Sequence, residues 1–238
     1  MSGALLREVK NMSAFTAVLK GTTEYESIKY SVNNKSLPMG ITGLSAVHKA
    51  HYISSLCCEA EKKALIICPD ENTASKLCDD INRFDGGAFM YPARDFHFRS
   101  AEGQSREFEQ KRIGVLTKIL DGECKYVLCS IEAACQFTLP DFELKKRTLD
   151  ISTDTEITQH EIIRALLCAG YVRCEAVEGT GQFSVRGGII DIFPPGSESP
   201  CRIEFWGDTV DSISLFDVQT QRRTQNLEKI KITPSMEV

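Results

Sequence analysis

The chain has 238 residues, of which 42% are hydrophobic and 26% are charged, and its formal net charge at pH 7 is −5. This composition is typical of a globular protein with one large domain or two ordinary ones. The sequence contains no run of about 18 apolar residues, so we expect no membrane span and no membrane partner. The acidic balance argues against a DNA-binding domain, because such domains usually carry a basic patch.

The sequence contains ten cysteines, and none of them is spaced as C-x-x-C. The spacing therefore indicates neither a zinc site nor a thioredoxin-like centre, and we expect no metal. The beginning of the sequence does not have the pattern of a secretory leader. We expect reduced thiols, mostly in the core, and a cytoplasmic location.

Residues 1–35 carry apolar side chains at helical spacing, which predicts short helices. Residues 40–47 read Gly-Ile-Thr-Gly-Leu-Ser-Ala-Val and are expected to form a loop that leads into a helix ending near residue 60. Three apolar runs of strand length follow, with helices between them, at residues 64–68, 88–91 and 126–130. Strands that alternate with helices predict a parallel sheet covered on both faces. We therefore expect an α/β domain over residues 1–141.

Asp70 and Glu71 follow the first of these strands, in the position of a Walker B motif. We interpret them as the start of a helix instead, because acidic residues stabilise helix N-termini. The following residues support a helix, since Leu77, Ile81 and Phe84 recur at i, i+4 and i+7.

The pattern changes after residue 140. Residues 142–149 read as a polar strand, and residues 158–161 form a capping box, T-x-x-E, that begins a helix. Residues 183–193 predict a pair of strands or one bulged strand, and residues 202–216 predict a β-hairpin with a two-residue turn. Residues 142–238 are therefore expected to form a smaller α+β domain with mostly antiparallel strands. Trp206, beside the hairpin turn, is expected to pack on the core or the turn, and the alternative is a contact with a partner.

The loop at residues 40–47 has the outline of a phosphate-binding loop, G-x-x-x-x-G-K-[ST], without its chemistry. Such a loop needs a second glycine, a lysine for the phosphates and a hydroxyl for Mg²⁺. Counted from Gly40, these three positions hold Ser45, Ala46 and Val47, and the other glycine is Gly43. We predict a degenerate P-loop in a P-loop-type domain, with no ATP binding, no cofactor and no catalytic residues.

Residues 170–222 resemble the second domain of the excision repair protein UvrB, and at least as closely the matching domain of bacterial transcription-repair coupling factors, the Mfd family. The resemblance is carried by V-R-G-G-I-I-D-I-F-P-P, E-F-x-G-D and F-D-x-x-T-Q-R. Residues 91–116 are similar to the first domain of the coupling factors. UvrB has an intact phosphate loop and a long tyrosine-rich DNA hairpin. The degenerate loop and the short polar segment after Tyr91 therefore favour the N-terminal, UvrB-like region of a coupling factor.

This resemblance implies a non-catalytic module that binds UvrA and recruits nucleotide excision repair to stalled RNA polymerase. In the full-length family protein, other domains bind polymerase and double-stranded DNA and act as a DNA-translocating ATPase. The UvrA-binding positions that match are Arg173, Phe183 and Arg186. One of the two arginines of the UvrB strand is replaced by Ser184. The alternative for these positions is that Phe183 belongs to the core and that Arg186 is an ordinary charge on the strand or forms an internal salt bridge.

Two other functions compete with a binding module. The first is an ATP-dependent repair subunit of the UvrB type, which the residues Ser45, Ala46 and Val47 argue against. The second is a DNA-binding domain, which the net negative charge and the absence of a long hairpin argue against.

Overall fold

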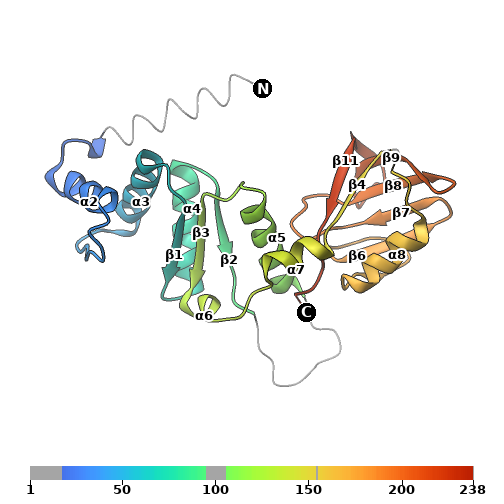
Figure 1. Cartoon of the computed structure of the whole chain (residues 1–238), viewed down its shortest axis with the longest axis horizontal. Helices are drawn as coiled ribbons and strands as arrows, with labels where there is room; N and C mark the ends of the chain where they lie inside the picture. The colour runs from blue at the N-terminus through green and yellow to red at the C-terminus, as the bar shows by residue number, and fades with distance from the viewer. Residues whose placement is uncertain (1–17, 95–105, 154, 238) are drawn as a thin grey trace. The chain divides into compact units, whose positions relative to one another are not determined.

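The computed structural model describes residues 18–94, 106–153 and 155–237. The chain divides into two compact units. The first unit consists of residues 1–93 and 122–135, and the second of residues 94–121 and 136–238. The protein is therefore mixed α/β, with one parallel sheet in the first unit and antiparallel strand pairing in the second (Figure 1).

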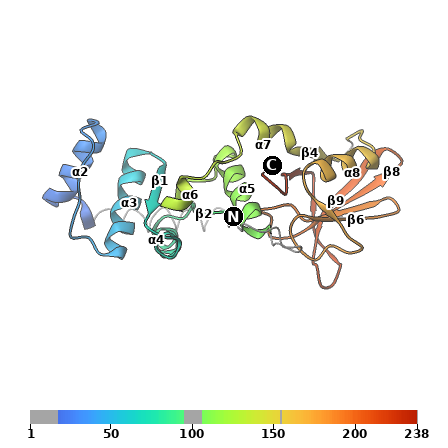
Figure 2. The ribbon, with the colours of Figure 1, turned by 90° about the horizontal axis from the view of Figure 1, so that it is seen from below.

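A three-stranded parallel sheet with strand order β1-β3-β2 forms the centre of the first unit. Its strands are β1 (Ala64–Cys68), β2 (Ala88–Tyr91) and β3 (Tyr126–Ser130). Among the described residues of this unit, the helices are α2 (Thr23–Asn33), α3 (Ala46–Ala60), α4 (Glu71–Phe84) and α6 (Ile131–Ala134). Helices α3 and α4 pack with the sheet in one hydrophobic core (Figures 1 and 2). The predicted strands and the parallel arrangement are confirmed.

Helix α4 begins at the acidic pair that resembles a Walker B motif. Asp70 is its N-cap, and its carboxylate accepts a hydrogen bond from the Thr73 backbone N–H at 2.8 Å. This bond satisfies one of the unpaired donors at the helix start and lowers the pKa of Asp70. Leu77 and Ile81 lie in the core, as the helical spacing predicts. The interpretation of Asp70 as a helix start is confirmed.

The sequence predicts that helices cover both faces of the parallel sheet, but part of one face is exposed. Strand β1 is at an edge, and its Leu65 and Ile67 are 66% and 54% exposed. Their neighbours on β1, Ala64, Ile66 and Cys68, pack into the core. Within the ranges that the structure describes, the helices thus leave part of this face of β1 uncovered.

The second unit contains a six-stranded sheet with strand order β10-β9-β8-β7-β6-β5 and a separate strand pair, β11-β4. Every pairing is antiparallel except the short parallel one between β5 and β6. The strands are β4 (Leu149–Ser152), β5 (Val172–Arg173), β6 (Gln182–Arg186), β7 (Ile189–Ile192), β8 (Cys201–Trp206), β9 (Thr209–Phe216), β10 (Arg223–Leu227) and β11 (Lys229–Ile232). The predicted strand pair and hairpin are β6–β7 and β8–β9, so both are confirmed.

Helix α8 (Gln159–Cys168) covers one face of the six-stranded sheet. Thr158 accepts a hydrogen bond from the Glu161 backbone N–H, and the Glu161 carboxylate accepts one from the Thr158 N–H in return. This capping box is the one that the sequence predicts. Ile162 and Leu166 of α8 are fully buried and pack with Ile190 and other sheet residues.

The expected strand over residues 142–149 is wrong in most of its length, because residues Asp141–Arg147 form helix α7. Acidic residues begin this helix and basic residues end it, which suits the helix dipole. Lys145 pairs with Asp141 and Arg147 with Glu143, both at i, i+4. Such pairs stabilise a helix. A reading that looks only at the alternation of polar and apolar residues does not detect them. Only β4, which begins at Leu149, has the extended conformation.

Helix α5 (Glu107–Leu120) lies between β2 and β3 in the sequence but packs within the second unit. Its Arg112 is fully buried, and Arg112 Nε donates to Glu237 Oε1 at 2.9 Å. The guanidinium also donates to Gln136 Oε1 and to the Phe137 carbonyl. These bonds join α5 to two segments of the second unit that are far from it in sequence.

A close glycine contact also holds α5. A Cβ at Gly114 would lie 3.2 Å from Gly196 Cα, and Gly196 has a φ of +80° in the turn after β7. Side chains at these two positions would keep the helix and the turn apart. None of the helices in the described ranges has the length and apolar character of a membrane-spanning helix.

Candidate partner-binding surface

The predicted binding residue Arg186 lies at the end of β6, before the tight turn Gly187-Gly188 that leads into β7. Gly187 has a φ of +57°, a conformation that glycine adopts readily. The register places Ser184 opposite Asp191 and Arg186 opposite Ile189. Side chains alternate between the two faces of a strand, so Ser184, Arg186 and Asp191 lie on the face opposite the core residues Phe183 and Ile190.

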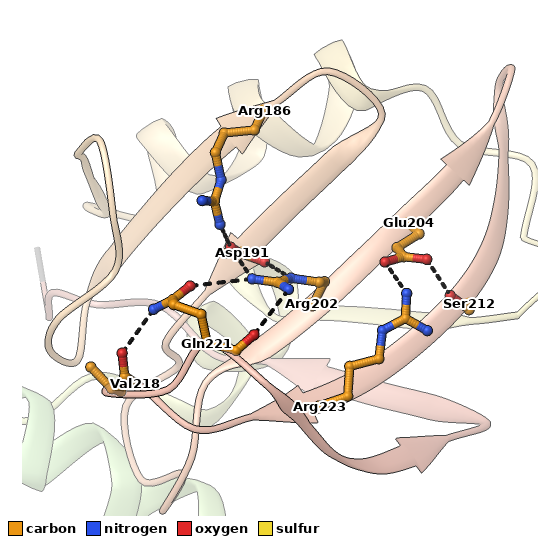
Figure 3. A network of polar contacts seen from close by, with 8 residues as sticks. All are labelled: Arg186, Asp191, Arg202, Glu204, Ser212, Val218, Gln221 and Arg223. Carbon is orange, nitrogen blue, oxygen red and sulfur yellow. Dashed lines mark hydrogen bonds and ion pairs between the residues drawn. The ribbon is translucent and has the colours of Figure 1, made fainter.

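Asp191 is the centre of the polar network on this face (Figure 3). Its side chain is only 1% exposed, and its two oxygens accept hydrogen bonds from two arginines. Arg186 Nη2 donates to Oδ2 at 2.6 Å, and Arg202 donates from Nε to Oδ1 at 2.7 Å and from Nη2 to Oδ2 at 2.9 Å. The hydrogen bonds that Arg202 donates to Asp191 raise the pKa of Arg202. Two guanidinium groups thus share one buried carboxylate.

The two arginines differ in exposure. The Arg202 side chain is mostly buried and stacks over the Phe216 ring at 4.6 Å. The Arg186 side chain is 51% exposed and makes a single hydrogen bond to Asp191. Since Arg202 alone makes a bidentate pair with Asp191, Arg186 keeps donors that a partner carboxylate can reach.

The other two predicted residues lie elsewhere. Phe183 is fully buried among core residues, so a partner cannot reach its ring. Arg173 is exposed on the edge strand β5, where the register places it beside Phe183. By the alternation of side chains, Arg173 and Arg186 therefore lie on opposite faces of the sheet. A partner that contacts both must reach around the β5 edge.

The sequence-based prediction missed Asp191 and Arg202. The run Ile-Ile-Asp-Ile-Phe, residues 189–193, carries the signal for Asp191, because a carboxylate within an apolar strand is rarely buried without a partner. Arg202 lies on the neighbouring strand β8, directly opposite Asp191 in the register. Only the strand pairing identifies it as that partner.

The predicted degenerate loop leads into α3. Gly40 and Gly43 lie before the helix, with a φ of +82° at Gly43, and no strand precedes them among residues 18–39. Ser45 is the N-cap of α3, and its side chain accepts a hydrogen bond from the His48 backbone N–H. Ala46 and Val47 form the first turn of the helix. The Ser45 hydroxyl therefore has a local structural role.

The described residues contain no group of three or more His, Cys, Asp or Glu side chains that could hold a metal ion. All ten cysteines are free thiols. Five of them are buried, whereas Cys135 and Cys168 are exposed.

Residues 149–237 match the family of the UvrB interaction domain. This part of the chain, which contains the six-stranded sheet and the Asp191 network, is therefore similar to that family. The chain as a whole is similar to transcription-repair-coupling factors. It is 30% identical to the factor of Bacillus subtilis over 230 residues, 28% identical to that of Staphylococcus aureus over 224 residues and 33% identical to that of Staphylococcus haemolyticus over 196 residues.

These alignments cover 95%, 93% and 81% of this chain, but only 20%, 19% and 17% of the relatives. The chain thus spans about a fifth of the length of the relatives it matches. The resemblance to the UvrB-like region of coupling factors is confirmed.

Proposed function

We propose that the second unit binds UvrA and that the chain serves, in the cytoplasm, to connect stalled transcription with nucleotide excision repair. The observation that carries this proposal is the half-exposed Arg186, held by a buried carboxylate within a UvrB interaction domain. An arginine fixed in this way loses little conformational freedom on binding and can form bidentate pairs with carboxylates. RNA polymerase and double-stranded DNA would be bound by other parts of a longer protein, which would also supply ATP-driven translocation.

Replacing Arg186 or Arg173 by alanine is expected to weaken binding to purified UvrA. A hot-spot arginine contributes on the order of 2 kcal/mol, which corresponds to about a thirtyfold rise in Kd. Asp191 keeps its bidentate pair with Arg202 in Arg186→Ala, so this variant should fold normally. Isothermal titration calorimetry of each variant against UvrA would measure the change.

Arg83→Ala is the matched control, because Arg83 is an exposed arginine of the first unit that pairs with the neighbouring Asp80. It should bind UvrA as tightly as the wild type. Wild-type affinity in both Arg173→Ala and Arg186→Ala, with the fold intact, would show that the proposed site is wrong.

We also propose that the first unit is a P-loop-type domain with a degenerate nucleotide site and has no catalytic activity of its own. The support is chemical, since residues 40–47 provide no lysine for phosphate, and the hydroxyl of Ser45 already caps α3. Titration of the chain with millimolar Mg-ATP in a calorimeter should therefore give only the heat of dilution. Saturable heat would contradict this proposal and favour an ATP-dependent repair subunit.

A further inference from the structure

Trp206 is the single tryptophan of the chain, and it lies at the tip of the β8–β9 hairpin with 84% of its surface exposed. The sequence leads us to expect packing on the core or the turn, and this expectation is wrong. Neighbouring Ile203 is fully buried, and Phe205 packs against the same core. The hairpin therefore buries its other apolar residues and leaves its largest one in water.

The register shows which face of the sheet carries Trp206. Ile203 and Phe205 of β8 pack with the core, so Arg202, Glu204 and Trp206 lie on the opposite side. The register shifts between Glu204 and Phe205, but the unpaired residue is Asp211 of β9, so the alternation along β8 continues. Arg202 is bonded to Asp191, and Asp191 is bonded to Arg186. Trp206 thus shares its face with the arginine of the proposed binding site.

A second ion pair lies on the same face, between Glu204 of β8 and Arg223 of β10 (Figure 3). Ser212 also donates a hydrogen bond to Glu204 Oε2. The acidic and the basic side chains of this network differ in their exposure to solvent. Asp191 is buried and Glu204 is mostly covered, whereas the side chains of Arg186 and Arg223 are about half exposed. The carboxylates lie beneath the guanidinium groups, so the network presents positive charge to the solvent.

We propose that Trp206, Arg186 and Arg223 form one docking surface, which we name the Trp206 face, and that its occupant is an acidic segment of UvrA with an apolar side chain. Carboxylates of that segment would pair with the two arginines, and the apolar side chain would cover the indole. Tryptophan and arginine are the residues that most often dominate protein interfaces, and the charge arrangement favours an acidic partner. The inference rests on the proposed function, because it names the part of UvrA that the domain recognises by its chemistry.

Trp206→Ala is expected to raise the Kd for UvrA about thirtyfold, and Arg223→Ala about tenfold. Phe137→Ala is the matched control, because Phe137 is 91% exposed in the same unit and its backbone carbonyl, which the substitution keeps, accepts its hydrogen bonds from Arg94 and Arg112. It should leave the Kd unchanged. Glu204→Gln removes a negative charge from the Trp206 face and frees Arg223, so it should tighten binding severalfold. If the Glu204–Arg223 pair had a purely structural role, Glu204→Gln and Arg223→Ala would both weaken binding.

The single tryptophan also allows a direct test. In the chain labelled with 5-fluorotryptophan, one ¹⁹F resonance should shift when UvrA is added. UvrA binding could depend on Arg186 although the ¹⁹F resonance does not shift and Trp206→Ala binds UvrA as tightly as the wild type. That combination of results would overturn the Trp206 face and leave the proposed function standing. The absence of any complex between UvrA and the wild-type chain would overturn both.

Discussion

Replacing Arg112 by alanine is expected to destabilise the second unit by about 3–5 kcal/mol, because it leaves the buried carboxylate of Glu237 without its closest partner. Both side chains are almost completely buried, with 2.9 Å between Arg112 Nε and Glu237 Oε1. Burial raises the pKa of Glu237, and the hydrogen bond and charge of Arg112 oppose that rise. Hydrogen exchange of the amides in β7 and β8 should measure the loss as exchange faster by about two to four orders of magnitude.

Two controls separate the loss of a buried ion pair from the loss of any arginine. Arg83→Ala removes an exposed arginine from the first unit and should change the stability by less than about 1 kcal/mol. Arg112→Met combined with Glu237→Gln removes both charges and retains similar volume, so it should recover much of the stability lost in Arg112→Ala. If the stability of Arg112→Ala measured by hydrogen exchange lay within about 1 kcal/mol of the wild type, the proposed contribution of the Arg112–Glu237 pair would be wrong.

Replacing Phe183 by alanine is expected to reduce the stability of the second unit by about 3–5 kcal/mol, because the change leaves a cavity in the main core. Phe183 is fully buried and packs among residues of α8 and the sheet. The effect on UvrA binding should come only through unfolding. At a temperature where the variant is still folded, its Kd should stay within about threefold of the wild type, in contrast to Arg186→Ala.

Phe183→Leu keeps most of the apolar volume and provides a milder version of the same test. Its cost in stability should be about 1.5 kcal/mol or less, so the protein should remain folded throughout a binding titration. A tenfold loss of UvrA affinity in folded Phe183→Leu would show that this ring contributes to the interface despite its burial.

Much of the fold could be predicted because the decisive signals are local. The capping box at residues 158–161 and the two-residue turn of the β8–β9 hairpin determine their elements through contacts between near neighbours. Asp70 begins α4 for the same reason. The sequence pattern does not reveal helix α7, because its stabilising pairs are polar and lie four residues apart and its buried residue, Leu144, gives little periodicity.

The parts that could not be predicted depend on contacts between residues far apart in the sequence. Arg112 and Glu237 are separated by 125 positions, and no pattern within α5 indicates a buried arginine. The candidate site also depends on contacts that the sequence alone does not predict. The resemblance to UvrB predicts Arg186 as a binding residue, but only the pairing of β7 with β8 shows that Asp191 holds it together with Arg202. The exposure of Trp206 likewise depends on how far the hairpin extends beyond the core.

Helix α5 has a consequence for how the chain responds to cleavage. The backbone passes between the two units three times, after residues 93, 121 and 135. A protease cut at the first crossing leaves β3 paired with β1 and β2, although it is now on the other fragment. A cut at the third crossing leaves α5 anchored through Arg112 to a fragment that no longer contains it. Nicked protein should therefore run as one particle in gel filtration and separate into two bands only in denaturant.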